Sequence, residues 1–177
     1  YQIAKNNMEV LNMLNTKYFI IGNEQGKEDV QQNSYANGNA WFVNEIRYVQ
    51  TADEEIIALD SLNTKEVAIL RDYNPYGFED SLKYNVDTLA TIKLTEYSLN
   101  TLSYDSFSNQ NEFAVFSEIY YKDGWNAYID GELKPHVSVN YVLRGIEIPA
   151  GNHNIEFKFE PKVIQTGSII SLISLAL

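Results

Sequence analysis

The chain has 177 residues, 45% of them hydrophobic, and a formal net charge of −11, which suits one domain with a core of its own. The negative charge argues against nucleic acid as a partner, because nucleic-acid affinity depends on neutralising phosphates with Lys and Arg, and against charge-driven adhesion to anionic lipids. With no cysteine in the sequence, disulfides and thiolate metal sites are excluded and the cellular compartment stays open.

The first half of the chain predicts short helices and strands. Apolar residues near helical spacing, among them Val10, Leu11 and Leu14, indicate an amphipathic helix that ends near Asn15. Thr51 is a predicted N-cap, because three acidic residues follow it at the positive end of the helix dipole. In chain order, the predicted elements are a helix over 3–15, a strand over 17–22, a loop or exposed hairpin over 23–39, a strand over 40–50, a helix from Thr51 to about Leu62, a strand over 67–71 and a loop over 72–87.

The second half predicts a run of short strands with a turn signal at nearly every break. Ile155, Phe157 and Phe159 alternate with charged residues, which is the pattern of a strand with one dry and one wet face. Asp130-Gly131 is a pair favoured in two-residue hairpin turns. The predicted elements are two strands or one long bent strand over 90–107, strands over 113–118, 125–129, 137–139, 141–148 and 155–159, and turns at 122–124, 130–131 and 149–152.

These elements predict a mainly β fold, an antiparallel β-sandwich of jelly-roll-like form with two short peripheral helices. Residues 1–167 form the predicted domain. Residues 168–177 are uncharged and mostly apolar, and they are too few to span a bilayer, which needs about 20 residues. They are either a last buried strand or helix or the first half of a transmembrane helix. Because the chain begins at Tyr1 with no initiator Met or signal peptide, we expect it to be a piece of a longer protein.

A pattern of residues in the second half is similar to that of a known family. Ser-Glu-x-Tyr-Tyr-x-x-Gly-Trp at 117–125, Asp-Gly at 130–131, Asn140, Arg144, Pro-Ala-Gly-x-His at 149–153 and Pro161 resemble the C-terminal extracytoplasmic part of YfhO-like bacterial membrane proteins. The entry at 11–18 also resembles that family, whereas Gly145 stands where Ala is commoner. The residues that carry the motif are Glu118, Gly124, Trp125, Asp130, Gly131, Arg144, Gly151 and His153.

Nothing in the sequence points to an active site, so we predict no catalytic residues, no metal and no cofactor. His136 and His153 lack cysteines and a helical ligand spacing that would make a zinc site, and we expect His153 to stabilise the turn at 149–151. Glu118 is the carboxylate to consider for glycoside chemistry, which needs a facing pair. Its predicted role is instead a buried ion pair with Arg144, since a buried charge needs a partner.

Aromatic residues are the remaining candidates for ligand binding. Trp41, Tyr120, Tyr121 and Tyr128 present ring faces on which a sugar could stack. Trp125 is the expected anchor of the core between the two sheets. Tyr120 and Tyr121 are adjacent, and alternating side chains must face opposite ways, so at least one of them is expected at the surface or the rim.

The resemblance implies a parent with many transmembrane helices, similar to glycosyltransferases that use lipid-linked sugars. It implies that this part is a non-catalytic domain on the periplasmic face of the bacterial inner membrane, with an accessory or acceptor-glycan-binding role. Its expected partners are its own transmembrane region and a cell-envelope glycan, and not nucleic acid. The alternatives are a carbohydrate-binding module and a purely structural interaction domain.

Overall fold

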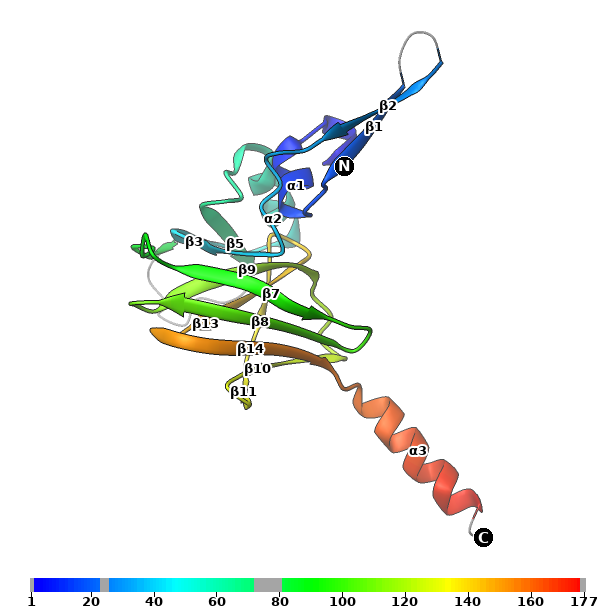
Figure 1. Ribbon diagram of the computed structural model, residues 1–177. Coiled ribbons are helices and arrows are strands. Elements are labelled where there is room, and N and C mark those ends of the chain that lie inside the picture. Colours follow the sequence, from blue (N-terminus) through cyan, green and yellow to red (C-terminus); the bar gives the residue numbers. More distant parts are fainter. Residues whose placement is uncertain (1, 23–25, 72–80, 176–177) are drawn as a thin grey trace.

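Two β-sheets packed face to face form the body of the molecule (Figure 1). The structure is a computed structural model, and it describes residues 2–22, 26–71 and 81–175. The predicted mainly β sandwich with two short peripheral helices is confirmed. A longer helix at the C-terminal end and a two-stranded ribbon near the N-terminus project from this body.

The first sheet has five strands and is built around β14 (Gly151–Phe159). β14 pairs on one side with β10 (Trp125–Ile129), which is followed outward by the short edge strand β11 (Glu132–Lys134). On the other side it pairs with β8 (Thr101–Ser108), and β7 (Thr91–Tyr97) is the far edge. The region 90–107 therefore forms two strands joined by a turn, the first of the two possibilities predicted for it.

The second sheet has seven strands, in the order β3-β9-β13-β12-β5-β4-β6. Their bounds are Ala40–Val43 for β3, Glu112–Ile119 for β9, Leu143–Ile148 for β13, Val137–Val139 for β12, Val67–Arg71 for β5, Glu45–Val49 for β4 and Ser81–Lys83 for β6. β4 and β5 run parallel. Parallel neighbours need a crossover, and α2 (Ala52–Ala58) with the 3-10 turn η2 (Leu59–Ser61) supplies it.

The prediction of a single strand over 40–50 was wrong. β3 pairs with β9, whereas β4 pairs with β5 and β6 at the other side of the sheet. The change of partner occurs at Asn44, whose backbone N–H donates to the Glu66 carbonyl over 2.7 Å. The predicted loop at 72–87 contains β6, and residues 72–80 of that loop lie outside the described residues.

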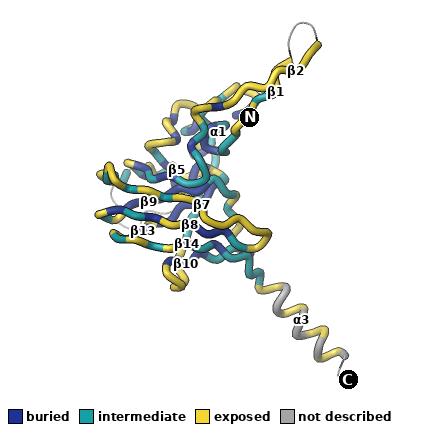
Figure 2. The backbone as a smooth tube through the Cα atoms, viewed as in Figure 1, coloured by how far each residue is buried: buried dark blue, intermediate teal, exposed yellow. Residues whose placement is uncertain are grey.

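Alternating side chains of β9 enter two different cores. Ala114 and Phe116 face the five-stranded sheet, where the Phe116 ring packs edge-on against Tyr104 at 4.8 Å and Phe157 at 4.9 Å between centroids. Phe113 and Val115 point the other way, into a core shared with the helices. β9 is thus covered on both faces, as its apolar run predicted, and Figure 2 shows buried residues concentrated along the strands of the sandwich.

The second core lies between the seven-stranded sheet and the helices α1 (Met8–Met13) and α2, and it includes Val10, Met13 and Leu59. The predicted cap is present. The Thr51 hydroxyl accepts from the Glu54 N–H (3.2 Å), and the Glu54 carboxylate accepts from the Thr51 N–H (3.1 Å). This reciprocal arrangement satisfies donors at the helix start that otherwise lack partners.

The first helix is shorter than predicted. The region 3–15 is divided into a 3-10 turn, η1 (Ile3–Lys5), and α1. Asn6 between them has a φ of 55°, a left-handed conformation that interrupts a right-handed helix. Asn7 then caps α1 by accepting from the Glu9 N–H over 3.1 Å, so the local hydrogen-bonding capacity of asparagine starts the helix anew.

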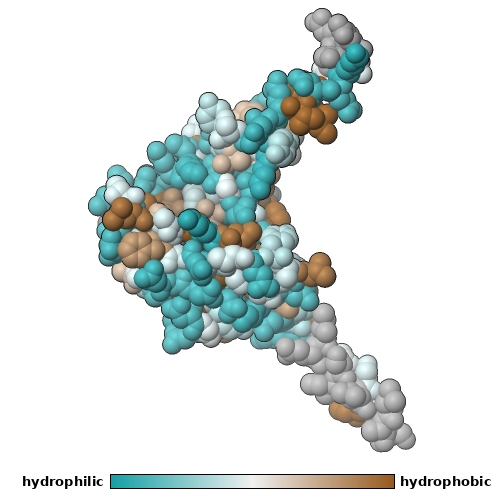
Figure 3. All heavy atoms as spheres, in the orientation of Figure 1, coloured by the Kyte–Doolittle hydropathy of each residue, from teal (hydrophilic) through white to brown (hydrophobic). Residues whose placement is uncertain are grey.

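Two elements leave the body in different directions (Figure 1). The ribbon of β1 (Tyr18–Gly22) and β2 (Glu28–Gln32) carries exposed apolar side chains, which Figure 3 shows as a hydrophobic group on an otherwise mostly hydrophilic face. At the other end, α3 (Lys162–Leu175) follows β14 and projects away from both sheets. None of the helices in the described ranges is both long and apolar enough to cross a membrane.

Candidate functional site

The four aromatic residues predicted to bind a ligand lie in different surroundings. Trp41 is only 4% exposed, and its indole N–H donates to the Thr64 carbonyl over 2.9 Å inside the helix-facing core. The prediction of a sugar-stacking role for Trp41 is therefore wrong, because the ring has no free face. The signal was ambiguous at the sequence level, since an aromatic residue in a strand suits a core as well as a binding surface.

Tyr128 is fixed by polar contacts on the outer face of the five-stranded sheet. Its hydroxyl donates to the Glu160 carboxylate over 2.7 Å, and the Lys158 ammonium lies 5.1 Å from the ring centroid. It alternates along β10 with Trp125, whose ring points into the sandwich. Tyr128 is thus separated by the sheet from the face on which Trp125 lies.

Tyr120 and Tyr121 divide as predicted. The ring of Tyr120 is half-buried and packs edge-on against His136 at 5.2 Å, whereas Tyr121 is 52% exposed. Tyr121 lies against Gly124, where a Cβ atom would overlap the rings of both Tyr121 and Phe159. The glycine of the Gly-Trp motif therefore lets two aromatic rings close over the backbone at this end of the sandwich.

Arg144 lies at the centre of the same end of the sandwich. It is 2% exposed, and its guanidinium carbon lies 4.4 Å from the ring centroid of Trp125 and 5.1 Å from that of Phe157. The Nε–H donates to the Ile119 carbonyl over 3.0 Å, while Nη1 has no hydrogen-bond partner. We call Arg144 with Trp125, Phe157, His136 and Tyr120, which are linked through ring contacts, the Arg144 cluster.

The predicted ion pair between Glu118 and Arg144 does not form as a direct contact. No oxygen of half-buried Glu118 lies within 4.0 Å of the guanidinium in the described part of the chain. Burial raises the pKa of Glu118, and the charge of Arg144 offsets this only in part. The faces of two aromatic rings and a backbone carbonyl therefore contact the cation. This arrangement depends on the order of the strands, which the sequence pattern did not reveal.

Burial shifts the other titratable groups of this interior. Burial, together with the charge of Arg144, lowers the pKa of His136 to about 4, so this imidazole is neutral at pH 7. Burial also raises the pKa of the Tyr104 hydroxyl, which has no hydrogen-bond partner. The Arg144 cluster therefore places one fixed positive charge among neutral groups, an arrangement suited to holding shape and orienting polar groups rather than to proton transfer.

The remaining motif residues join two turns at the opposite end of β14. The Asp130 carboxylate accepts from the Asn154 N–H (2.9 Å) and contacts His153 Nδ1 at 2.6 Å, while His153 Nε2 lies 3.2 Å from the Ala150 carbonyl. Both ring nitrogens face acceptors, so Asp130 raises the pKa of His153. The predicted hydrogen bonding of His153 within this turn is present. Gly131 and Gly151 have φ values of 82° and 125°, which only glycine adopts readily.

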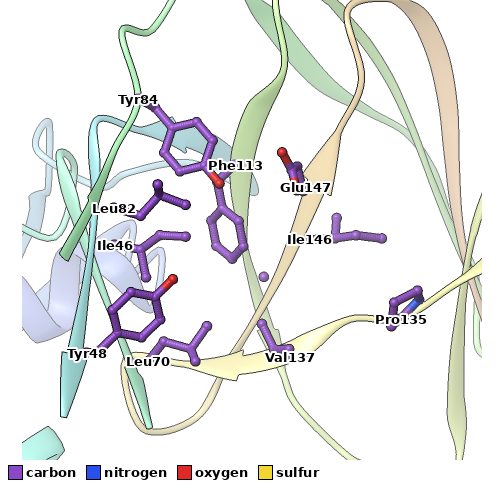
Figure 4. A pocket seen from close by; sticks show the side chains of 11 residues that line it. Ile46, Tyr48, Leu70, Leu82, Tyr84, Phe113, Pro135, Val137, Ile146 and Glu147 are labelled. Atoms are coloured by element: carbon purple, nitrogen blue, oxygen red, sulfur yellow. The ribbon is translucent and has the colours of Figure 1, made fainter. Parts of the chain in front are cut away.

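An apolar cavity of about 440 Å³ opens on the face of the seven-stranded sheet that is turned away from the five-stranded sheet (Figure 4). The rings of Tyr48, Tyr84 and Phe113 gather on one side of it. Gly145 contributes to the wall, where a Cβ atom would lie 2.6 Å from the Phe113 ring. Glu147 supplies the charged group of the lining, so the cavity offers apolar contact and no assembled catalytic group.

No group of three metal-ligating side chains occurs among the residues that the structure describes.

Over residues 7–171 the chain matches the family model described as bacterial membrane protein YfhO. No curated protein and no solved structure matches this chain.

Proposed function

Because the chain belongs to the family of the bacterial membrane protein YfhO, we propose that it forms a non-catalytic domain on the extracytoplasmic side of the membrane. In this proposal α3 leads from the sandwich toward the membrane, and the domain recognises an acceptor glycan for the membrane part of the protein. Any sugar transfer would then take place in that membrane part.

The character of α3 supports the membrane-proximal position. After Lys162 the helix carries no charged residue, and the side chains of Val163, Ile170 and Ile173 are exposed. Apolar side chains on a helix that projects from its own domain (Figure 1) favour an apolar environment such as a bilayer.

The roles of the candidate carboxylates support a non-catalytic domain. Asp130 is engaged with His153 and Asn154, and it holds two turns together. Glu118 is half-buried, and its carboxyl group interacts electrostatically with Arg144. Glycoside chemistry requires two carboxyl groups facing each other across the bond that breaks, so these residues serve the fold.

The exposed ring of Tyr121 is the observation that carries the recognition role. It lies against Gly124, at the end of the sandwich that contains the Arg144 cluster. A rigid aromatic face loses little conformational entropy on binding, and it offers apolar area to a flat ligand. Sugar rings present such an apolar face.

A glycan-array screen of the purified chain tests the proposal, with Tyr121→Ala beside the matched control Tyr35→Ala. Tyr35 is also an exposed tyrosine, and it lies in the segment that follows the β1–β2 ribbon. We expect binding to a subset of glycans that is lost in folded Tyr121→Ala and kept in Tyr35→Ala. Binding that survives Tyr121→Ala, or silence across the array, would contradict the recognition role and leave a structural domain.

A further inference from the structure

The end of the sandwich from which α3 departs exposes a set of apolar side chains, and we propose that this end rests in the headgroup region of a lipid bilayer. The contact is formed by Tyr97, Leu99 and Ile119, which we call the rim. This inference depends on the part of the proposed function that directs α3 into the membrane, and it does not depend on glycan recognition.

Hydrogen bonds place the rim around the base of α3. Phe159, three residues before the helix begins, donates its backbone N–H to the Asn100 carbonyl over 2.9 Å, next to Leu99. Glu160 donates to the Gly124 carbonyl over 2.7 Å, and Gly124 contacts Tyr121. The turn between β7 and β8 and the turn before β10 therefore lie at the level where α3 leaves the sandwich.

The second sheet ends at the same level. Arg144 reaches from β13 to the Trp125 ring, and Trp125 pairs with Phe159 at the end of β14. The Nε–H of Arg144 is bonded to the carbonyl of Ile119, the last residue of β9. The exposed side chain of Ile119 thus belongs to the α3 end of the molecule.

The exposure of the rim is unusual for a surface in water. Leu99 is 96% exposed at the tip of its turn, and Tyr97 of the same hairpin is 69% exposed. Isolated exposed apolar residues are ordinary on proteins, but these lie near the base of a helix that carries no charged residue after Lys162. Tyrosine is enriched where membrane meets water, since its ring suits the acyl boundary and its hydroxyl suits the headgroups.

The charges of the chain select the kind of lipid surface. A net charge of −11 opposes attraction to anionic headgroups, so the contact we infer is apolar and is formed on a zwitterionic bilayer. Lys162, the first residue of α3, lies where its long side chain can reach the headgroups. The 14 residues of the helix extend about 21 Å at 1.5 Å per residue, which is far enough to enter the hydrocarbon.

Because the chain has no cysteine, single cysteines can report the environment of chosen sites. Leu99→Cys and Leu89→Cys are a matched pair, since both leucines are exposed and lie just beyond the two ends of β7. Leu89 is at the end remote from α3. Each variant is labelled with an environment-sensitive fluorophore and added to phosphatidylcholine vesicles that carry nitroxide quenchers at known depths. Ile170→Cys reports the position of α3.

We expect the label at 99 to shift to shorter wavelength and to be quenched by shallow nitroxides, and the label at 170 to be quenched by deep ones. The label at 89 should behave as it does in buffer. A label at 99 that matches the label at 89 while α3 is inserted would overturn the inference, and so would a label at 170 that stays in water.

A second pair of variants measures the contribution of the rim to affinity. Leu99→Glu should weaken vesicle binding about tenfold, because it removes one leucine from the apolar contact and adds a charge. Leu89→Glu should leave binding unchanged. Equal binding by the two variants would contradict the inference. Failure of the glycan screen affects none of these readouts, so the two proposals can fail independently.

Discussion

Arg144 keeps a full positive charge inside the sandwich, since a guanidinium does not lose its proton in proteins. Burying a charge is costly unless other groups compensate for the lost hydration. Here the ring faces of Trp125 and Phe157 and the Ile119 carbonyl compensate for it in part. The charge in turn acts on its neighbours: burial lowers the pKa of His136, and the charge of Arg144 lowers it further.

Lowering the pH should destabilise the protein through His136. The unfolded chain binds a proton near the usual pKa of about 6.5, whereas the folded chain binds it only near pH 4 because burial and Arg144 lower the pKa of His136 to about 4. Between these values the unfolded state holds more protons, so stability present above pH 6.5 is lost as the pH falls, by up to about 3 kcal/mol. Urea denaturation at pH 7 and pH 4.5 measures it.

Carboxylates with lowered pKa values, such as Asp130, also reduce the stability of the protein at low pH. The variant His136→Phe separates the contribution of His136 from theirs, because it removes the imidazole and leaves the carboxylates in place. We expect a smaller loss of stability in His136→Phe than in the wild type. His153→Gln is a control in which the dependence of stability on pH is reversed. Asp130 raises the pKa of His153, so the stabilisation that protonated His153 contributes is present at low pH and is lost as the pH rises. An identical pH dependence in wild type and His136→Phe would rule out the role of His136.

Among the elements, α2 is the crossover that sets β4 and β5 parallel, and its start depends on one side chain. Thr51→Ala removes the acceptor for the Glu54 N–H and should lower the free energy of unfolding by about 1 kcal/mol. Urea denaturation checks this, with Thr51→Ser as the matched variant that retains the hydroxyl. If serine is as destabilising as alanine, the capping explanation is incorrect.

Local signals predicted the elements that depend on neighbours in sequence. The cap at Thr51, the turn at Asp130-Gly131 and the alternation along β14 are each contained in a few residues, and each is present in the structure. Signals that depend on strand order were missed. The region 40–50 carries enough apolar residues, at 41, 43, 46 and 48, to predict one strand, and only its two separate pairings divide it.

The candidate site shows the same limit. Local alternation predicted that one of Tyr120 and Tyr121 is exposed, without saying which, and turn chemistry predicted the role of His153. The stacking of Arg144 on Trp125 depends on two strands in different sheets, and so does the absence of a direct contact with Glu118. Burial of Trp41 likewise requires the helix-facing core, which forms only when α1, α2 and the seven-stranded sheet come together.

At the scale of the whole molecule, we expect stability and membrane attachment to be carried by separate parts. Both cores share the seven-stranded sheet, and β9 contributes to each of them with alternate residues. The described side chains at 163, 170 and 173 of α3 are exposed, and the helix projects from the sandwich (Figure 1). The fold should therefore persist when α3 is removed.

A chain that ends after Pro161 tests this separation. Its urea midpoint should match that of the full chain, because none of the described side chains of the removed helix belongs to either core. Its co-sedimentation with phosphatidylcholine vesicles should fall to background at lipid concentrations that saturate the full chain, because the helix, which carries no charge after Lys162, supplies most of the apolar contact in this proposal. Full vesicle binding without α3, or loss of the cooperative unfolding transition, would contradict the separation.

The position of the cut matters, and a second truncation shows why. Glu160 accepts hydrogen bonds from the Tyr128 hydroxyl and the Asn126 amide, and its own N–H donates to the Gly124 carbonyl. A chain that ends after Phe159 loses all three contacts and should unfold at lower urea than one that ends after Pro161. Since a hydrogen bond contributes about 1 kcal/mol, equal midpoints would mean that these contacts do not stabilise the edge between β10 and β14.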